Sequence, residues 1–411
     1  MTLPAPNTTD RPSAASRPAI DALMTVTHRP APVFTRGRGS WLWDDQGRRY
    51  LDLVQGWAVN TLGHAAPPVV AALTRQAAEL MHVGPGFHNA PAIALASRLT
   101  GLCGLDRCFF TNSGAEANEG AIKLARKFGQ LHRGGAHEII TFTDGFHGRT
   151  LATMSASGKP GFDTLFAPQV PGFPKARLND LASVQALISP RTVAVMLEPI
   201  QGEAGVVEAS PAFLQAVRRL CDAHGLLLIL DEVQTGVGRT GRWWGHEASG
   251  IRPDIMTLGK GLGGGAPIGA LLAREAVCCF APGDQGGTFN GNGLVCAAAL
   301  AVIEAVAAPG FLADVQARGA QWREGLARLG ERLGSGPVRG QGLLLALDLP
   351  GTDLAARAAD ALRERAGTGV LVNAVRPHRL RLMPALNISR EETALGIEAI
   401  TEAVMGPAGT R

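Results

Sequence analysis

The chain has 411 residues, of which 46% are hydrophobic and 18% charged, so it can bury a substantial core and is not globally disordered. Its net charge of +4 is spread without a block of like charges, which argues against nucleic acid as the main partner. No uninterrupted apolar run reaches membrane-spanning length, and the first 20 residues lack the apolar stretch of a signal peptide. We therefore expect a soluble protein of the cytoplasm.

The N-terminal region contains two different kinds of sequence. Residues 1–18 are rich in Pro, Ser, Thr and Ala and are expected to form a flexible tail. Residues 41–52 contain two apolar segments around an Asp-Gln-Gly turn, which predicts a β-hairpin. We expect residues 19–65 to join a smaller domain formed by the end of the chain.

From about residue 90 the pattern changes to strands that alternate with helices. The expected strands are apolar on both faces, as strands covered by helices on both sides must be. They lie at residues 108–110, 138–142, 193–197, 226–230, 255–258 and 270–273. Helix ends are also legible: Ser210-Pro211 predicts a start, and Gly225 predicts a stop. This order predicts an α/β fold with a mainly parallel sheet over residues 66–297.

The C-terminal part has a different character. An alanine-rich helix expected at Ala298–Ala308 leads into an α+β region, which predicts a second, smaller domain at residues 298–411. The six cysteines show no C-x-x-C spacing, so we expect buried reduced thiols rather than zinc ligands or disulfides. No metal site is expected.

Lys260 and Asp231 are the most informative residues, because each directly follows a buried apolar run. Lys260 opens a loop with five glycines between positions 259 and 265. A lysine amine can hold the aldehyde of pyridoxal 5'-phosphate (PLP) as a Schiff base, and an aspartate can keep the pyridine nitrogen protonated. The alternative is a solvated loop lysine. Further parts of a PLP site elsewhere in the chain favour the cofactor.

One such part is the segment Ser113-Gly114-Ala115-Glu116, which matches a capping box at the start of a helix extending to Leu131. Free N–H groups and the positive end of the helix dipole make this a suitable phosphate site. A capped helix without a ligand is the alternative, and the presence of Lys260 and Asp231 favours phosphate.

Phe146 and Arg149 follow the expected strand at 138–142. An aromatic ring there can stack on a pyridine face, and an arginine can bind a carboxylate with two hydrogen bonds. A core phenylalanine and a surface arginine are equally compatible with the residues alone.

Two glycine-rich segments do not support nucleotide binding. Residues 236–241 fit G-x-G-x-x-G, but Arg242-Trp243-Trp244-Gly245 follows instead of a helix. Gly259-Lys260 is followed by glycine rather than Ser or Thr, so it is not a P-loop. NAD and ATP are therefore not expected.

Several motifs in one order resemble the class III (omega) aminotransferases from about residue 32 to about residue 400. They are T111-NSGAEANE-119, F146-HGRT-150, E198-PIQGE-203, D231-EVQTG-236 and G259-KG-261. The resemblance implies the PLP-dependent transferase fold type I (aspartate-aminotransferase-like), with PLP as cofactor. It also implies a homodimer with shared active sites.

The resemblance assigns roles to residues that the pattern alone leaves open. Around the cofactor, Gly114 and Ala115 hold the phosphate, and Thr288 reaches it from the neighbouring subunit. Phe146 stacks on the ring, Val233 packs under it and Gln234 bonds its phenolic oxygen. Ser113, Asp231 and Lys260 complete this set.

For the substrate, the resemblance makes Arg149 the ligand of the α-carboxylate. Glu203 and Arg381 match a gate pair in which Glu203 neutralises Arg381 and then swings aside. Gly56 takes the place where ornithine-specific relatives carry a tyrosine that contacts the free α-amino group, which leaves room for an acyl group.

The expected reaction is therefore transfer of the terminal amino group of N2-acetylornithine to 2-oxoglutarate, giving glutamate, as in arginine biosynthesis. Ornithine, succinyldiaminopimelate and 4-aminobutyrate remain alternative amino donors. A non-catalytic PLP-binding relative would have lost Lys260 or Asp231, and both are present.

Overall fold

The computed structural model describes residues 22–375 and 378–406. Contacts divide the chain into two units, Met1–Val33 and Phe34–Arg411, and every helix and strand named below belongs to the second. The tail expected at residues 1–18 lies outside the described residues.

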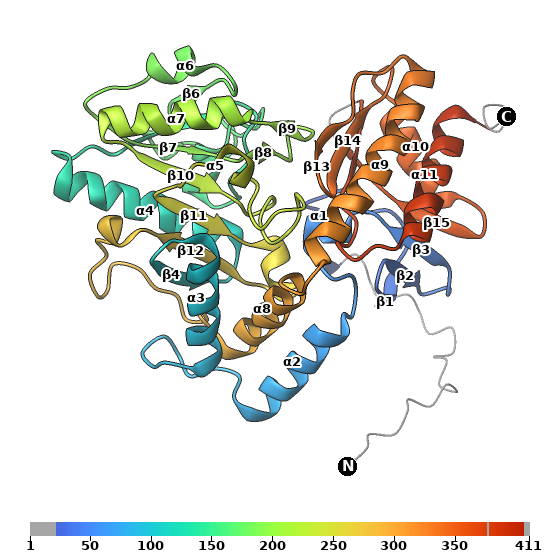
Figure 1. Cartoon of the computed structure of the whole chain (residues 1–411), viewed down its shortest axis with the longest axis horizontal. Coiled ribbons are helices and arrows are strands. Elements are labelled where there is room, and N and C mark those ends of the chain that lie inside the picture. Colours follow the sequence, from blue (N-terminus) through green and yellow to red (C-terminus); the bar gives the residue numbers. More distant parts are fainter. Residues whose placement is uncertain (1–21, 376–377, 407–411) are drawn as a thin grey trace. The chain divides into compact units, whose positions relative to one another are not determined.

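A seven-stranded sheet forms the larger part of this unit (Figure 1), in the order β4-β12-β11-β10-β7-β5-β6. Its strands are β4 Arg107–Thr111, β5 Glu138–Phe142, β6 Lys175–Ala176, β7 Thr192–Leu197, β10 Leu227–Asp231, β11 Ile255–Leu258 and β12 Gly269–Ala273. All pairs from β11 to β6 are parallel, which confirms the predicted mainly parallel α/β fold. The exception is β12, which runs antiparallel to both β11 and β4. Residues 259–268 contain only the short 3-10 helix η3 (Lys260–Gly263), too little for the crossover that a parallel connection needs.

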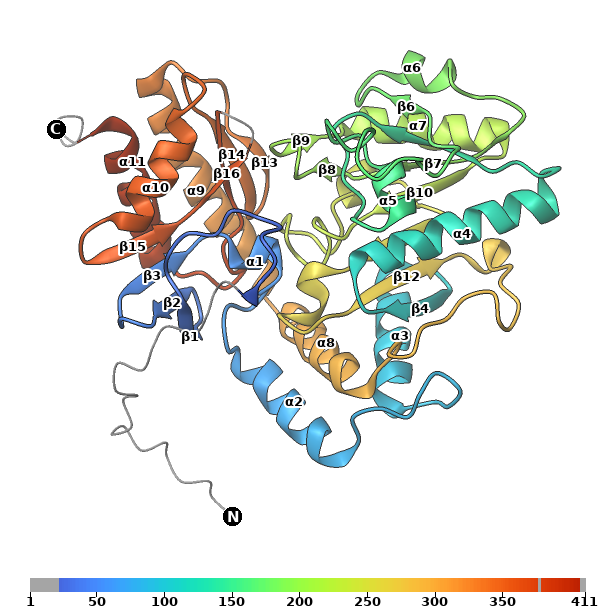
Figure 2. The ribbon, with the colours of Figure 1, turned by 180° about the vertical axis from the view of Figure 1, so that it is seen from behind.

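Helices cover both faces of this sheet, as Figures 1 and 2 show for α4 and α7. The helices of this part are α2 Pro67–Glu79, α3 Ala90–Cys103, α4 Gly114–His132, α5 Leu151–Ala156, α6 Leu181–Gln185, α7 Pro211–His224 and α8 Gly293–Val306. Ile139 packs in a core cluster with α4, whereas the adjacent Ile140 packs in a cluster with α7, because successive strand residues point to opposite faces. The predicted ends of α7 are confirmed: Ser210 accepts from Phe213 N–H, and Gly225 has a φ of 61°.

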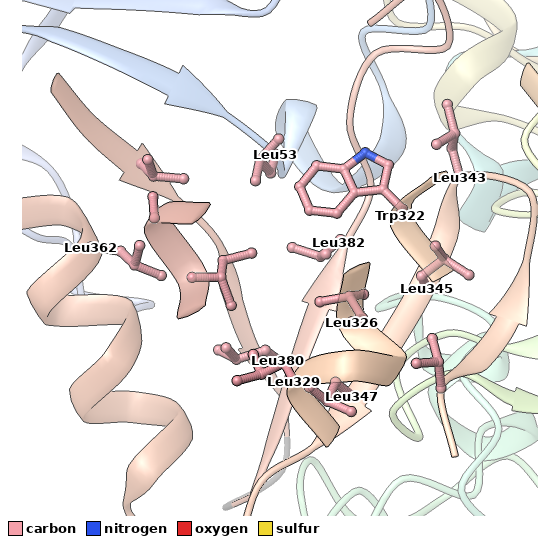
Figure 3. Packing of buried hydrophobic residues seen from close by; sticks show 14 of the residues in the cluster. Leu53, Trp322, Leu326, Leu329, Leu343, Leu345, Leu347, Leu362, Leu380 and Leu382 are labelled. Carbon is pink, nitrogen blue, oxygen red and sulfur yellow. The ribbon is translucent and has the colours of Figure 1, made fainter. Parts of the chain in front are cut away.

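A second group of elements surrounds Trp322 (Figure 3), whose side chain packs among leucines of strands and helices from the C-terminal region. Its elements are α9 Phe311–Leu333, β13 Arg339–Gln341, β14 Leu344–Asp348, α10 Leu354–Glu364, β15 Thr368–Leu371, β16 Asn373–Val375, β17 Arg379–Leu382 and α11 Arg390–Met405. The expected hairpin is present as β2 Trp41–Asp44 and β3 Arg49–Asp52, preceded by β1 Phe34–Arg38. Strand β3 pairs in parallel with β15, so one C-terminal strand completes the four-stranded sheet β1-β2-β3-β15, while β13, β14, β17 and β16 form a separate sheet.

Two predictions about the C-terminal half need correction. The helix expected at Ala298–Ala308 begins at Gly293, because the Asn292 side chain caps it by accepting from Leu294 N–H. A boundary at 298 would cut this helix, whose Val302 and Ile303 pack in the core of the larger sheet. We therefore propose that the smaller domain begins after α8.

The cysteines also differ from expectation. All six are free, but only Cys221 and Cys296 are buried, and Cys278 is exposed because it follows the surface 3-10 helix η4 (Glu275–Val277). In the described part of the chain, no single helix is long and apolar enough to cross a membrane. Helices α8 and α9 reach the length and hydropathy of a membrane span only when they are counted together, and the chain bends by 74° between them.

Candidate active site

The predicted site residues gather at one edge of the large sheet. Asp231 ends β10, Glu198 follows β7, and Lys260 lies two residues after β11. Parallel strands present their carboxyl ends at the same edge, where ligands of such sheets bind. Strand β4 points the same way, since two antiparallel pairings separate it from β11, so the start of α4 reaches this edge too.

Asp231 is 3% exposed and is held by three hydrogen-bond partners. Its Oδ1 accepts from Val233 N–H over 3.0 Å. Its Oδ2 accepts from Asn118 Nδ2 and contacts His147 Nδ1, both over 2.8 Å. These contacts fix the position of the carboxylate. An acceptor for a pyridine N–H needs such a fixed position.

Asn118 and His147 were not assigned roles by sequence reasoning, although both lie in the motifs that carry the resemblance. Asn118 also donates to the His147 carbonyl over 2.8 Å and accepts from the Thr257 hydroxyl over 2.6 Å. The His147 N–H donates to Ser157 Oγ over 2.8 Å. Their place in those motifs was the available signal, but their partners lie far away in the sequence.

Lys260 has a strained backbone and an unusual environment. Its φ of 41° lies in the left-handed region, and the next residue is anchored through Gly261 O, which accepts from the Thr61 hydroxyl over 2.6 Å. Burial lowers the pKa of the Lys260 amine, while the nearby charges of Glu203 and Asp231 oppose that shift. A lowered pKa increases the neutral fraction of the amine, which is the nucleophilic form.

The start of α4 has the geometry of a phosphate site but only half of the predicted capping box. Ser113 Oγ accepts from Glu116 N–H over 3.2 Å. The Glu116 carboxylate turns instead to Asn112, accepting from its backbone N–H over 2.6 Å. A Cβ at Gly114 would lie 2.7 Å from Val233 Cγ1, so only glycine fits at this position. Val233 is the residue expected to pack under the pyridine ring of PLP. The N–H groups of Gly114 and Ala115 lie in the first turn, where the helix supplies no acceptor.

Gln234 is 6% exposed, and its Nε2 has no hydrogen-bond partner among the described residues. Its side chain occupies space that Gly202 leaves open, because a Cβ there would lie 1.5 Å from Gln234 Oε1. A buried amide donor without a partner is suited to a phenolic oxygen.

Glu203 and Arg381 form the predicted pair, with Oε1 and Nη2 2.9 Å apart. Asn373 Oδ1 accepts from Nε and Nη2 of Arg381, over 3.0 and 2.7 Å, while the buried Nη1 has no partner in the described part of the chain. Burial raises the pKa of Glu203, but the Arg381 and Lys260 charges outweigh it and the net shift is downward. The neighbouring Glu198 differs: burial and the Asp231 charge raise its pKa well above the usual range.

Phe146 and Arg149 lie on the loop after β5. The Phe146 N–H donates to Glu198 Oε2 over 2.9 Å, which fixes the backbone beside the site. Arg149 is exposed, and its guanidinium lies 5.6 Å from the Phe162 ring centre. Arg149 is therefore a solvent-accessible cation beside the Phe162 ring.

Gly56 and Thr288 lie outside the large sheet, on a turn and on a loop. Gly56 belongs to a turn, α1 (Gln55–Ala58), in which all four residues have positive φ, a left-handed turn that sequence reasoning missed. Thr288 is exposed on the loop before α8 and makes no hydrogen bond to the site residues described here. Its expected role needs a second subunit.

The residues present fit PLP. The structure offers a buried aspartate for the ring nitrogen, a buried amide donor without a partner at Gln234, and free N–H groups at a helix start. It also offers a buried lysine whose amine has a lowered pKa and feels the charge of Asp231. In the described residues no group of His, Cys, Asp and Glu has the arrangement of a metal site.

Comparison with known proteins places the chain in a family. The model of the class-III aminotransferases matches residues 24–404, so the chain belongs to this family. It is a PLP-dependent aminotransferase, as the sequence predicted.

Among its relatives, acetylornithine aminotransferase 2 of Bordetella bronchiseptica is 58% identical, over 93% of this chain and 96% of its own. Acetylornithine aminotransferase of Ralstonia nicotianae is 57% identical, over 91% and 94%. Among solved structures, ornithine aminotransferase of Toxoplasma gondii has a TM-score of 0.88 at 31% identity, covering 95% of this chain and 94% of its own. N-acetylornithine aminotransferase of Stenotrophomonas maltophilia has a TM-score of 0.79 at 39% identity, covering 93% and 98%.

Proposed function

We propose that this aminotransferase moves the terminal amino group of N2-acetylornithine to 2-oxoglutarate, in arginine biosynthesis. The observation that carries the proposal is the Glu203–Arg381 pair, in which a guanidinium that is 1% exposed faces a carboxylate that is 25% exposed. The 57–58% identity to relatives named acetylornithine aminotransferase supports the choice of amino donor.

The two substrates make opposite demands on this pair. The reacting end of acetylornithine carries no carboxylate, so a bare Arg381 beside it would be buried without a partner, which is costly. Glutamate and 2-oxoglutarate carry a carboxylate beside the reacting carbon. When Glu203 withdraws, Arg381 Nη1 and Nη2 are available to bind that carboxylate with two hydrogen bonds.

The remaining residues divide the chemistry between them. Bound PLP supplies the electron sink that makes the hydrogen next to the reacting amine acidic. With PLP bound, Asp231 would accept from the ring N–H, Lys260 Nζ would take and return the proton, and Arg149 would bind the distal α-carboxylate of acetylornithine. Ser113, Gly114, Ala115 and Gln234 would hold the cofactor, and Phe146 and Val233 would pack against its ring.

Ornithine is the second candidate donor, because the ornithine aminotransferase of Toxoplasma gondii shares the fold with a TM-score of 0.88. Gly56 favours the acylated substrate, since it presents no side chain to contact a free α-amino group. Its φ of 63° also explains why a glycine is well suited there.

A half-reaction screen tests the function. The PLP-loaded protein is mixed with acetylornithine, ornithine, succinyldiaminopimelate or 4-aminobutyrate, and the loss of its visible absorption is followed. We expect the highest kcat/KM with acetylornithine, and a higher value with any other donor would refute the assignment. In Arg381→Ala, the glutamate half-reaction should fall by at least about 100-fold and the acetylornithine half-reaction by less than tenfold. Equal losses would refute the gate.

We also propose a cytoplasmic homodimer in which Thr288 contacts the phosphate of the partner's site. Exposed apolar side chains near Thr288 support a covering subunit: Phe289 is 60% exposed, Phe87 76% and Ile93 56%. Phe87 and Ile93 line one hollow together with residues 285–287 and 290–291. Sedimentation of the purified protein tests this, and a monomer at micromolar concentration would contradict it.

A further inference from the structure

Lys159 lies three residues beyond α5 and faces the Glu203–Arg381 pair from the other side. Its Nζ is 3.8 Å from Glu203 Oε2, whereas Glu203 Oε1 faces Arg381 Nη2 at 2.9 Å. The single carboxylate is therefore shared between a buried cation and a half-exposed one, since the Arg381 side chain is 1% exposed and that of Lys159 is 35% exposed.

Two aromatic rings hold Lys159 in this position. Its Nζ lies 5.7 Å from the Phe146 ring centre and 5.6 Å from that of Phe162, distances at which a cation is attracted to a ring face. Arg149 lies over the same Phe162 ring at 5.6 Å. Lys159 thus stands between the residue proposed to bind the distal carboxylate and the acid of the gate.

This position matters because opening the gate has a cost. When glutamate binds, Glu203 must leave Arg381, and a partly buried carboxylate without a cation loses most of its electrostatic stabilisation. Lys159 already faces the second oxygen of Glu203, so a small side-chain rotation exchanges one cation for the other. Acetylornithine does not require this exchange, because Glu203 stays on Arg381.

We propose that Lys159 is a specificity-determining residue, which holds the Glu203 carboxylate while Arg381 binds the α-carboxylate of glutamate. The inference rests on the proposed function of the gate. Lys159 acts through Glu203 and does not take part in the proton transfer.

Replacement of the lysine tests the proposal in both half-reactions. Lys159→Met keeps the length and apolar contacts of the side chain and removes the charge, and Lys159→Arg is the matched control that keeps the charge. A partly exposed ion pair contributes modestly, so in Lys159→Met the ratio of kcat/KM for glutamate to that for acetylornithine should fall about two- to fivefold. Lys159→Arg should restore at least half of that ratio.

A second measurement needs no turnover and neither amino donor. Glutarate carries two carboxylates and valerate carries one at similar length, so only glutarate requires the open gate. By titration calorimetry on the PLP-loaded protein, Lys159→Met should weaken glutarate about two- to fivefold more than valerate. If wild type fails to accept acetylornithine, the proposed donor is wrong, while this comparison still decides the role of Lys159.

A double-mutant cycle tests whether Lys159 acts by holding the Glu203 carboxylate or only by attracting the anionic ligand with its positive charge. In a Glu203→Gln background there is no carboxylate to hold, so adding Lys159→Met should leave the glutarate-to-valerate ratio unchanged. The proposal is overturned if Lys159→Met affects both ligands equally, if it affects neither, or if its selective effect persists in Glu203→Gln.

Discussion

The same substitution at two buried threonines should lower stability at one position and leave it unchanged or raise it at the other. Thr257, in β11, and Thr393, in α11, are both 0% exposed. The Thr257 hydroxyl donates to Asn118 Oδ1 over 2.6 Å, whereas the Thr393 hydroxyl has no hydrogen-bond partner among the described residues. Valine keeps the branched shape and replaces the hydroxyl with a methyl group. The pair therefore isolates the hydrogen bond that orients the amide beside Asp231.

The magnitude follows from what each replacement leaves behind. Thr257→Val buries Asn118 Oδ1 without its donor, which costs about 1–3 kcal/mol, and the new methyl recovers about 0.8 kcal/mol. We expect a net loss of about 0.2–2 kcal/mol in the free energy of unfolding. Thr393→Val removes a hydroxyl that burial already penalises, so the expected change lies between zero and a gain of about 1 kcal/mol.

Urea unfolding of the cofactor-free protein at equal subunit concentrations measures both changes as shifts of the midpoint at constant m-value. The midpoint should fall in Thr257→Val and stay or rise in Thr393→Val. If both variants lose the same stability, the Thr257–Asn118 hydrogen bond does not support the site in the way described.

Three further outcomes are expected. Lys260→Ala should bind PLP without a covalent bond and lose transamination activity by several orders of magnitude. Borohydride reduction of the wild-type protein followed by peptide mapping identifies the lysine that carries PLP, and a labelled lysine other than Lys260 would contradict the assignment. Asp231→Asn should keep the fold but slow both half-reactions at least about 100-fold in stopped-flow measurements, because an amide cannot stabilise a protonated ring; near-normal rates would exclude the proposed role. Burial lowers the pKa of Lys175 from 10.5 to about 7, so between these values the unfolded chain binds a proton that the folded chain lacks. This contribution should raise stability from pH 7 toward 10.5, and Lys175→Met should flatten the rise in urea midpoints between pH 7 and 9; an identical pH dependence in both proteins would contradict the reasoning.

The sequence by itself determined the elements that carry local signals. Strands β5 and β11 match their predicted bounds, because a continuous apolar run between polar ends specifies a doubly covered strand. Helix α7 begins and ends as predicted, because a serine cap and a left-handed glycine act within a few residues. The proximity of Asp231 to Lys260 was also predictable, since adjacent parallel strands end at one edge of the sheet.

Only the tertiary structure decided which remote groups meet. The partners of Asp231, Asn118 and His147, are separated from it by 113 and 84 residues, and no local pattern encodes such pairings. The role proposed for Lys159 could not be predicted from the sequence either. It depends on Glu203, Phe146 and Phe162, which loops bring close to the Lys159 amine. The left-handed turn at Gln55–Ala58 also depends on tertiary contacts. Non-glycine residues there adopt an unfavourable φ because surrounding contacts, including the Asp52 side chain accepting from Gln55 N–H over 3.0 Å, outweigh their local preference.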